Sequence, residues 1–142
     1  MRALLDVNVL IALRDADHAS HERAVSWFAD HARSGWASCP ITENGCIRVM
    51  SNASYPNCVP AKAVMERLVE ACQGPLHQFW ADDVSLLDPR ITDFGRIHGP
   101  RQLTDVYLLA LATRNGGAFV TFDAAVPLSA VRGAKRSQLV TL

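Results

Sequence analysis

Short apolar runs alternate along the chain with longer segments whose apolar residues recur at helical spacing. Each run is three to five residues long and stops at a polar or turn-forming residue, as buried strands do. These runs predict strands at residues 3–5, 36–39, 77–81, 118–121 and 139–141. The segments between them repeat apolar positions every three or four residues, which is typical of amphipathic helices. They predict helices at residues 7–13, 18–33, 41–50, 60–73 and 103–115.

This alternation indicates an α/β domain with a parallel sheet and helices on both faces. We expect an α/β/α sandwich around a central, mostly parallel sheet of four to five strands. Residues 51–59 carry turn formers and no periodicity, so they predict a loop, and residues 82–102 predict a loop with a short helix. The length of 142 residues suits one domain, and no repeat or linker divides it. We therefore expect a single domain over residues 1–142.

Composition excludes several classes of protein. Apolar residues make up 49% of the chain, which is too many for a disordered protein. No apolar run reaches the roughly 18 residues that span a bilayer, and Asp6 interrupts the start too early for a secretory signal. We therefore expect a cytoplasmic protein without a membrane partner. The four cysteines contain no CxxC pair, which predicts free, buried thiols in a reducing compartment rather than a zinc knuckle.

Four acidic residues lie where one predicted element gives way to the next. Asp6 ends the first strand, Asp123 follows the strand at residues 118–121, and Asp105 and Glu43 lie in first helical turns. Each has an ordinary alternative as a turn former or a helix cap. Strand ends and some helix starts meet at one edge of a parallel sheet, where ligands bind. Carboxylates that meet there repel one another, and a bound Mg²⁺ or Mn²⁺ would remove that repulsion.

Three segments then resemble motifs of the PIN-domain nucleases. They read LLDVNVLI at residues 4–11, TDVYLLALA at residues 104–112 and TFD at residues 121–123. Glu43, after Thr42 and before an apolar helical pattern, matches the place of the family's glutamate. The segment that starts at His18 is similar to the second helix of the VapC toxin branch. The resemblance covers nearly the whole chain in order and spacing, and it is weakest between residues 51 and 101.

The resemblance implies a PIN-like fold and a VapC-like endoribonuclease, the toxin of a type II toxin–antitoxin pair. Such an enzyme cleaves structured RNA, either tRNA or rRNA, by metal-activated attack of water on a phosphodiester. It implies Mg²⁺ or Mn²⁺ as cofactor, a homodimer, and a small VapB-like antitoxin as partner. Carried over to this chain, the catalytic residues are Asp6, Glu43, Asp105 and Asp123, and the three aspartates are the metal ligands.

Further residues are expected to support this site. Asn8 either orients Asp6 and a metal-bound water or caps a helix. Thr104 either supports the site or caps the following helix. Thr121 either contacts Asp123 or the site water, or it has a structural role. Arg101 and Arg114 are candidate contacts to RNA phosphates, with ordinary solvated surface as the alternative.

Charge at first argues against nucleic acid as a partner. Fourteen basic residues balance 14 acidic ones, whereas nucleic-acid-binding domains usually carry a basic excess. If four acids occupy a metal site, ten remain against 14 basic residues, an excess of about four elsewhere. Only two of the basic residues are lysines, so arginine, which suits planar phosphate contacts, dominates. Neutrality therefore does not exclude RNA.

Two alternatives remain open from the sequence. A PIN-like module could bind RNA or protein without cleaving it, although the four acids are all present. A phospho-accepting receiver-like domain also has a strand that ends in an aspartate. It would need an acidic pair beside that aspartate and a lysine late in the chain. Asp6 has no acidic neighbour before it, and Lys62 and Lys135 are the only lysines.

Overall fold

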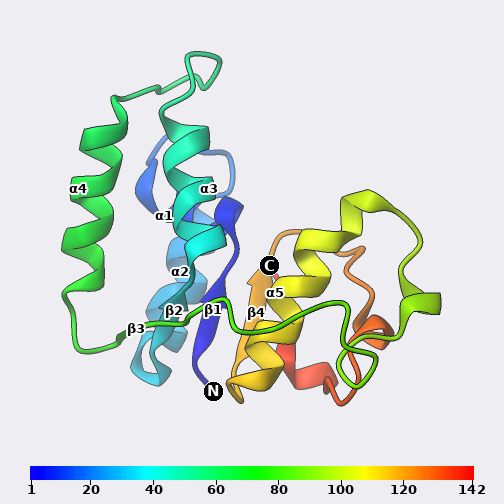
Figure 1. Cartoon of the computed structure of the whole chain (residues 1–142). Helices are drawn as coiled ribbons and strands as arrows, with labels where there is room; N and C mark the ends of the chain where they lie inside the picture. The colour runs from blue at the N-terminus through cyan, green and yellow to red at the C-terminus, as the bar shows by residue number, and fades with distance from the viewer.

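The computed structural model describes all 142 residues and is built around a five-stranded sheet (Figure 1). All four neighbouring strand pairs are parallel, and the strand order is β3-β2-β1-β4-β5. Receiver domains have the order 2-1-3-4-5 instead, so the topology excludes that alternative. The strands are β1 (Ala3–Leu5), β2 (Trp36–Ser38), β3 (His77–Phe79), β4 (Ala118–Thr121) and β5 (Leu139–Thr141).

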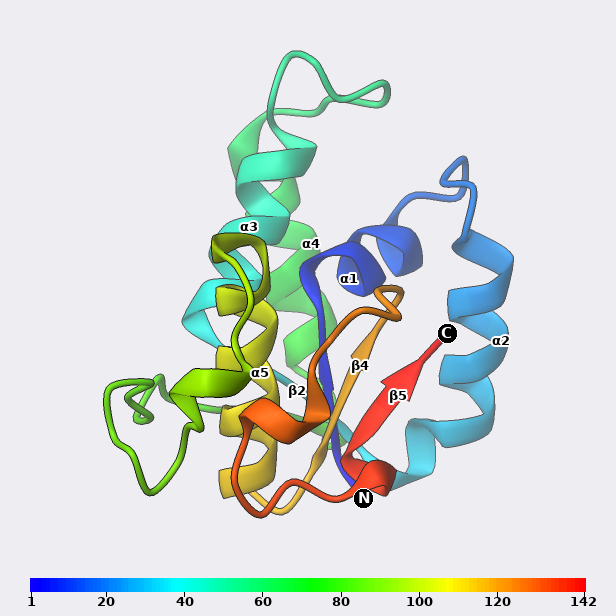
Figure 2. The same ribbon diagram turned by 90° about the vertical axis from the view of Figure 1, so that its right-hand side faces the viewer.

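Helices occupy the connections between the strands. They are α1 (Val7–Arg14), α2 (His21–His31), α3 (Pro40–Met50), α4 (Ala61–Cys72) and α5 (Leu103–Arg114). Figure 2 shows α5 and α2 on opposite sides of the sheet, with the α3–α4 pair rising beyond its edge. None of these helices combines the length and the apolar character that crossing a bilayer would need.

Each face of the sheet covers its own hydrophobic core, because side chains alternate along a strand. Leu4 and Phe119 are fully buried in the core that contains α5. Their chain neighbours Leu5 and Val120 are buried in the other core, with α1, α3 and α4. This arrangement confirms the predicted α/β/α sandwich, and all five predicted strands and five predicted helices are present.

Several predicted boundaries differ from the structure. The second helix begins at His21 and not at residue 18, because the main-chain amide of Ser20 donates to the His18 ring and forms a turn there. Pro60 precedes α4 as its cap residue instead of being its first residue. The short helix expected within residues 82–102 is a pair of 3₁₀ turns, Phe94–Arg96 and Pro100–Gln102.

The topology gathers one edge of the sheet into a site. The central strands β1 and β4 are direct neighbours, with Leu5 beside Val120, so the residues that follow them emerge together. Helix α5 runs back along the sheet, and its first turn lies at this same edge (Figure 1). Asp6 comes directly after β1, Asp123 lies two residues after β4, and Asp105 is the third residue of α5.

Candidate functional site

Asp6 is the most tightly held of the candidate residues. It caps α1 and is only 8% exposed. One carboxylate oxygen accepts a hydrogen bond from the main-chain amide of Val7 at 2.7 Å, and the other accepts from Thr121 Oγ1 at 2.7 Å. Burial raises the pKa of Asp6, while the two hydrogen bonds oppose that rise by stabilising the charged form. Its orientation is therefore fixed from two sides.

Asp105 and Asp123 complete a group that we call the aspartate cluster (Asp6, Asp105 and Asp123). Burial raises the pKa of Asp105 to about 6, and the charges of Asp6 and Asp123 contribute further. Asp123 is exposed, and its carboxylate accepts a hydrogen bond from the main-chain amide of Ala125 at 2.7 Å. The three carboxylates are thus close enough to act on one another's charge.

Thr121 joins two members of this cluster. Its buried hydroxyl donates to Asp6 and accepts from the main-chain amide of Asp123 at 3.1 Å. Because Thr121 is the last residue of β4, its position in the sheet fixes how Asp6 lies relative to Asp123. Contact with Asp123, one of the roles considered for Thr121, is made through the main chain.

No basic side chain compensates the aspartate cluster. The ion pairs of the structure involve other acids, and none includes Asp6, Asp105 or Asp123. Three mutually repelling carboxylates without a counter-charge are a suitable ligand set for a hard divalent cation such as Mg²⁺ or Mn²⁺. The donor chemistry therefore fits the metal that the sequence predicts, and Asp6, Asp105 and Asp123 are the residues that could hold it.

Glu43, the fourth predicted acid, faces elsewhere. Its carboxylate accepts a hydrogen bond from Ser38 Oγ at 2.5 Å, and the donor atoms of Glu43, Cys72 and His77 lie within 4.8 Å of one another. The charges acting on Asp6 and Asp105 are those of the aspartate cluster and do not include Glu43. The structure therefore brings together three of the four predicted acids and places the fourth in a second group.

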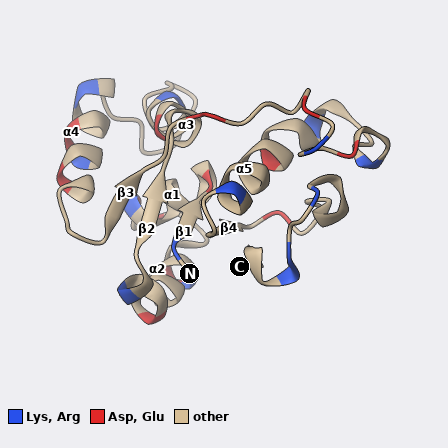
Figure 3. Cartoon of the chain, turned by 60° about the horizontal axis from the view of Figure 1, so that its bottom comes forward, with Lys and Arg blue, Asp and Glu red and all other residues tan.

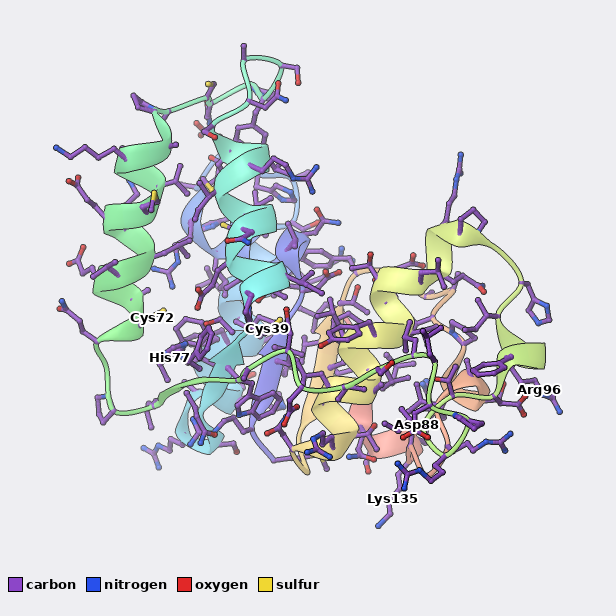
Figure 4. All side chains as sticks on the ribbon, viewed as in Figure 1. Cys39, Cys72, His77, Asp88, Arg96 and Lys135 are labelled. Atoms are coloured by element: carbon purple, nitrogen blue, oxygen red, sulfur yellow. The ribbon has the colours of Figure 1, made fainter.

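That second group, which we call the mixed-donor cluster (Ser38, Glu43, Cys72 and His77), was not predicted from the sequence. His77 Nε2 lies 2.8 Å from Ser38 Oγ, and the Cys72 thiol is a further hydrogen-bond partner of this hydroxyl. Burial raises the pKa of the Cys72 thiol and lowers that of His77. Figure 4 shows Cys72 at the last turn of α4 and His77 close by.

A sequence signal for the mixed-donor cluster exists but is weak. Cys72 and His77 are five residues apart, across the predicted turn between a helix and a strand. All four cysteines are free, as predicted, and Cys39 and Cys46 are buried. The expectation that every cysteine is buried is wrong for Cys58, which is exposed, and Cys72 is only half-buried.

Neither Asn8 nor Thr104, two of the predicted supporting residues, caps a helix. Asn8 is exposed in the first turn of α1, and Asp6 takes the capping position that was one alternative for it. Thr104 is also exposed, and the interpretation that it caps α5 is wrong. The 3₁₀ turn at Pro100–Gln102 leads directly into α5, so Gln102 is the cap residue and the helix already begins at Leu103.

The two candidate phosphate-binding arginines lie at opposite ends of α5. Arg101 is exposed in the turn just before α5, four residues from Asp105. Arg114 is in the last turn of the helix and forms an ion pair with Asp83 at 3.1 Å. Nine residues of helix, roughly 13 Å, separate Arg114 from Asp105 along the axis. Of the two arginines, only Arg101 is therefore at the Asp105 end of α5.

Comparisons with known proteins agree with this geometry. Residues 3–132 match the PIN domain family. The chain is 49% identical to the ribonuclease VapC44 of Mycobacterium tuberculosis over 142 residues, all of both chains. It is 44% identical to the ribonuclease VapC39 of the same organism over 94% of this chain and 96% of that protein. The ribonuclease VapC38 is 46% identical over 87% of this chain and 86% of that protein.

Proposed function

Because this chain belongs to the PIN-domain family and to its VapC branch, we propose that it is a metal-dependent endoribonuclease and the toxin of a VapBC-type pair. The observation that carries the proposal is the aspartate cluster. Asp6, Asp105 and Asp123 come from three different elements and act on one another's charge without a basic partner. Three like charges held together lower the stability of the fold. A metal-dependent nuclease, in contrast, uses such carboxylates as ligands for its ion.

The aspartates are proposed to hold Mg²⁺ or Mn²⁺. When bound, such an ion lowers the pKa of a coordinated water and stabilises negative charge on a phosphoryl group. The protein contributes the orientation of the ligands. Thr121 and the amide of Val7 fix both oxygens of Asp6, and the amide of Ala125 fixes one oxygen of Asp123. Asp105 then brings the third charge from α5.

The family resemblance implies that Glu43 is catalytic, but this proposal leaves it outside the catalytic residues. Its carboxylate is engaged by Ser38, and no contact links it to the aspartate cluster. The proposed chemistry therefore depends on three acids, with Asn8 as the exposed polar neighbour of Asp6. A catalytic contribution of Glu43 would require its side chain to leave Ser38.

RNA is proposed as the substrate, and tRNA or rRNA as its class, in keeping with the ribonuclease relatives. Lys and Arg lie on several separate elements and do not form one continuous stripe (Figure 3). With a net charge of zero, weak non-specific binding at physiological salt is expected. Arg101, beside the start of α5, is the arginine proposed to contact a phosphate near the cleaved bond.

Two protein partners belong to the proposal. A small VapB-like antitoxin would silence the nuclease in the cytoplasm, where its RNA substrates are. A homodimer would bury the outer face of α4, where Met65 is 51% and Val69 is 59% exposed. Replacing Met65 with glutamate is expected to shift the light-scattering mass toward the monomer and to leave the fold intact.

The proposal is tested by cleavage of total tRNA and rRNA with the purified full-length chain. Cleavage is expected with Mg²⁺ or Mn²⁺, to stop in excess chelator, and to be absent in the Asp6→Ala variant. Equal cleavage with and without chelator would contradict metal dependence. RNA binding without any cleavage under all metal conditions would favour the non-catalytic PIN-like module instead.

A further inference from the structure

The mixed-donor cluster lies at the β3 side of the sheet, away from β4 and the turn that carries Asp123. Its members come from four elements, with Ser38 on β2, Glu43 on α3, Cys72 on α4 and His77 on β3. Glu43, Cys72 and His77 are each half-buried, so they are shielded from bulk water yet reachable by an ion. Ser38 beneath them is only 1% exposed.

The hydroxyl of Ser38 is the hydrogen-bonding centre of this cluster. Ser38 Oγ is 2.5 Å from Glu43 Oε1 and 2.8 Å from His77 Nε2, and it also contacts the Cys72 thiol. A hydroxyl has one hydrogen to donate, and the carboxylate takes it. Its oxygen has two lone pairs left, which can accept from the His77 ring and the Cys72 thiol, so three different ligand types converge on one hydroxyl.

We propose that Glu43, Cys72 and His77 form a Zn²⁺ site that is separate from the aspartate cluster. Sulfur, imidazole nitrogen and carboxylate oxygen are the three ligand types that zinc takes in proteins. Their donor atoms lie within 4.8 Å of one another. In a tetrahedral zinc site, neighbouring donors are about 3.3–3.7 Å apart, so a contraction of about 1 Å suffices. The fourth position is left for water or for Ser38 Oγ.

The two clusters should discriminate between metals. The aspartate cluster offers only carboxylate oxygens, which suit Mg²⁺ and Mn²⁺, whereas thiolate and imidazole ligands select softer ions. Binding at the mixed-donor cluster releases the thiol proton of Cys72 to solvent, because the thiolate is the ligand. Excess Mg²⁺ therefore does not compete there.

Zinc at this place would connect the ends of three elements. Cys72 is the last residue of α4, His77 is the first residue of β3, and Glu43 is in the first turn of α3. β3 is an edge strand of three residues. A bound ion would fix the end of α4 and this strand to α3, so it should stabilise the folded chain.

The test uses Co²⁺ as a spectroscopic substitute for Zn²⁺, with the metal-free full-length chain in excess Mg²⁺. One equivalent of Co²⁺ is expected to give a thiolate-to-cobalt charge-transfer band that Zn²⁺ then abolishes. The band is expected to disappear in Cys72→Ser, and the Zn²⁺ affinity of His77→Gln to fall at least about tenfold. Cys58→Ser, which removes the exposed cysteine, is the matched control and keeps the band.

Two results would overturn the zinc site. One is a wild-type chain that shows no charge-transfer band. The other is a band that survives in Cys72→Ser, because the thiolate would then be a different cysteine. The outcome does not depend on the proposed nuclease, since Asp105→Asn is expected to keep the Co²⁺ band while losing cleavage. Zn²⁺ is also expected to raise the melting temperature of the wild type but not of Cys72→Ser.

Discussion

The aspartate cluster and the mixed-donor cluster contain a similar number of polar groups but solve opposite problems. In the first, three like charges crowd together, and only Thr121 and main-chain amides donate to them. In the second, Glu43, Cys72 and His77 differ in chemistry and already share hydrogen bonds with Ser38. The like charges of the first cluster repel one another, and a bound cation would relieve that repulsion. The second cluster is held together by hydrogen bonds without an ion, and the proposed zinc would connect its elements more firmly.

The largest effect should come from substituting an aspartate. Asp105→Asn is expected to lower kcat/KM for RNA cleavage on the order of 10³-fold, because a metal contributes several kcal/mol to transition-state stabilisation. The measurement is a time course with end-labelled RNA at saturating Mg²⁺. Cys72→Ser serves as the control and should stay close to wild type. A comparable loss in both variants would show that the two clusters act as one site.

Removing the group that orients Asp6 should have an intermediate effect. Thr121→Val deletes the hydroxyl that donates to Asp6 and accepts from Asp123. The Mg²⁺ concentration for half-maximal cleavage is expected to rise about 10- to 100-fold, as is usual when an outer partner of a metal ligand is lost. Thr141→Val makes the same change at an exposed position of β5 and should not alter it. An unchanged Mg²⁺ requirement in Thr121→Val would assign Thr121 a purely structural role.

A smaller effect concerns the pH dependence of stability. The pKa of Asp105 is raised to about 6 in the folded chain, above its usual value near 4, so folding favours the protonated form. The metal-free wild type should therefore lose stability as pH rises from about 4 to about 6, and the loss should persist above that window. Asp105→Asn removes this penalty and is expected to melt a few degrees higher at pH 7.5.

Added Mg²⁺ provides the control for this stability difference. Because the ion binds only the ionised carboxylates, it should stabilise the wild type at pH 7.5 and leave Asp105→Asn nearly unchanged. Thermal melts by circular dichroism at pH 4.5 and pH 7.5, with and without Mg²⁺, give four melting temperatures for each of the two chains. If Asp105→Asn melts lower than the wild type in the absence of metal, Asp105 is not crowded by its neighbours.

The smallest effect on cleavage is expected for Glu43. Glu43→Gln retains an acceptor for Ser38, and it changes no contact of the aspartate cluster. Mg²⁺-dependent cleavage should therefore change by no more than about threefold, a size far below that of a lost metal ligand. The comparison is again kcat/KM on the same RNA. A loss as large as that of Asp105→Asn would return Glu43 to the catalytic set that the family resemblance implies.

The sequence predicts the aspartate cluster better than the position of Glu43, for a geometric reason. Asp6 and Asp123 follow strands, and the ends of neighbouring parallel strands must emerge together. A helix, in contrast, turns by about 100° per residue, so two positions differ by about 200°. In α3, Gly45 lies against Val7, so the face at residue 45 is turned toward α1 and Glu43 is turned away. Periodicity alone does not say which face of α3 packs on α1.

The fold itself follows from local patterns almost completely. Alternating burial along short strands and apolar stripes on helices are properties of single segments, and all ten elements could be identified from them. The interpretation of Thr104 failed because a 3₁₀ turn at Pro100–Gln102 leads directly into α5. The mixed-donor cluster was missed because it depends on how four separate elements pack, and no single segment contains that information.

The hydrogen bond from Thr121 to Asp6 joins positions 115 residues apart, and it has a consequence for biosynthesis. During translation, Asp6 leaves the ribosome long before Thr121 and Asp123 have been made. The β1–β4 pairing that brings them together can form only after almost the entire chain has been synthesised. A growing chain therefore carries no complete aspartate cluster, and the proposed nuclease site cannot form on the ribosome until β4 has been made and docks.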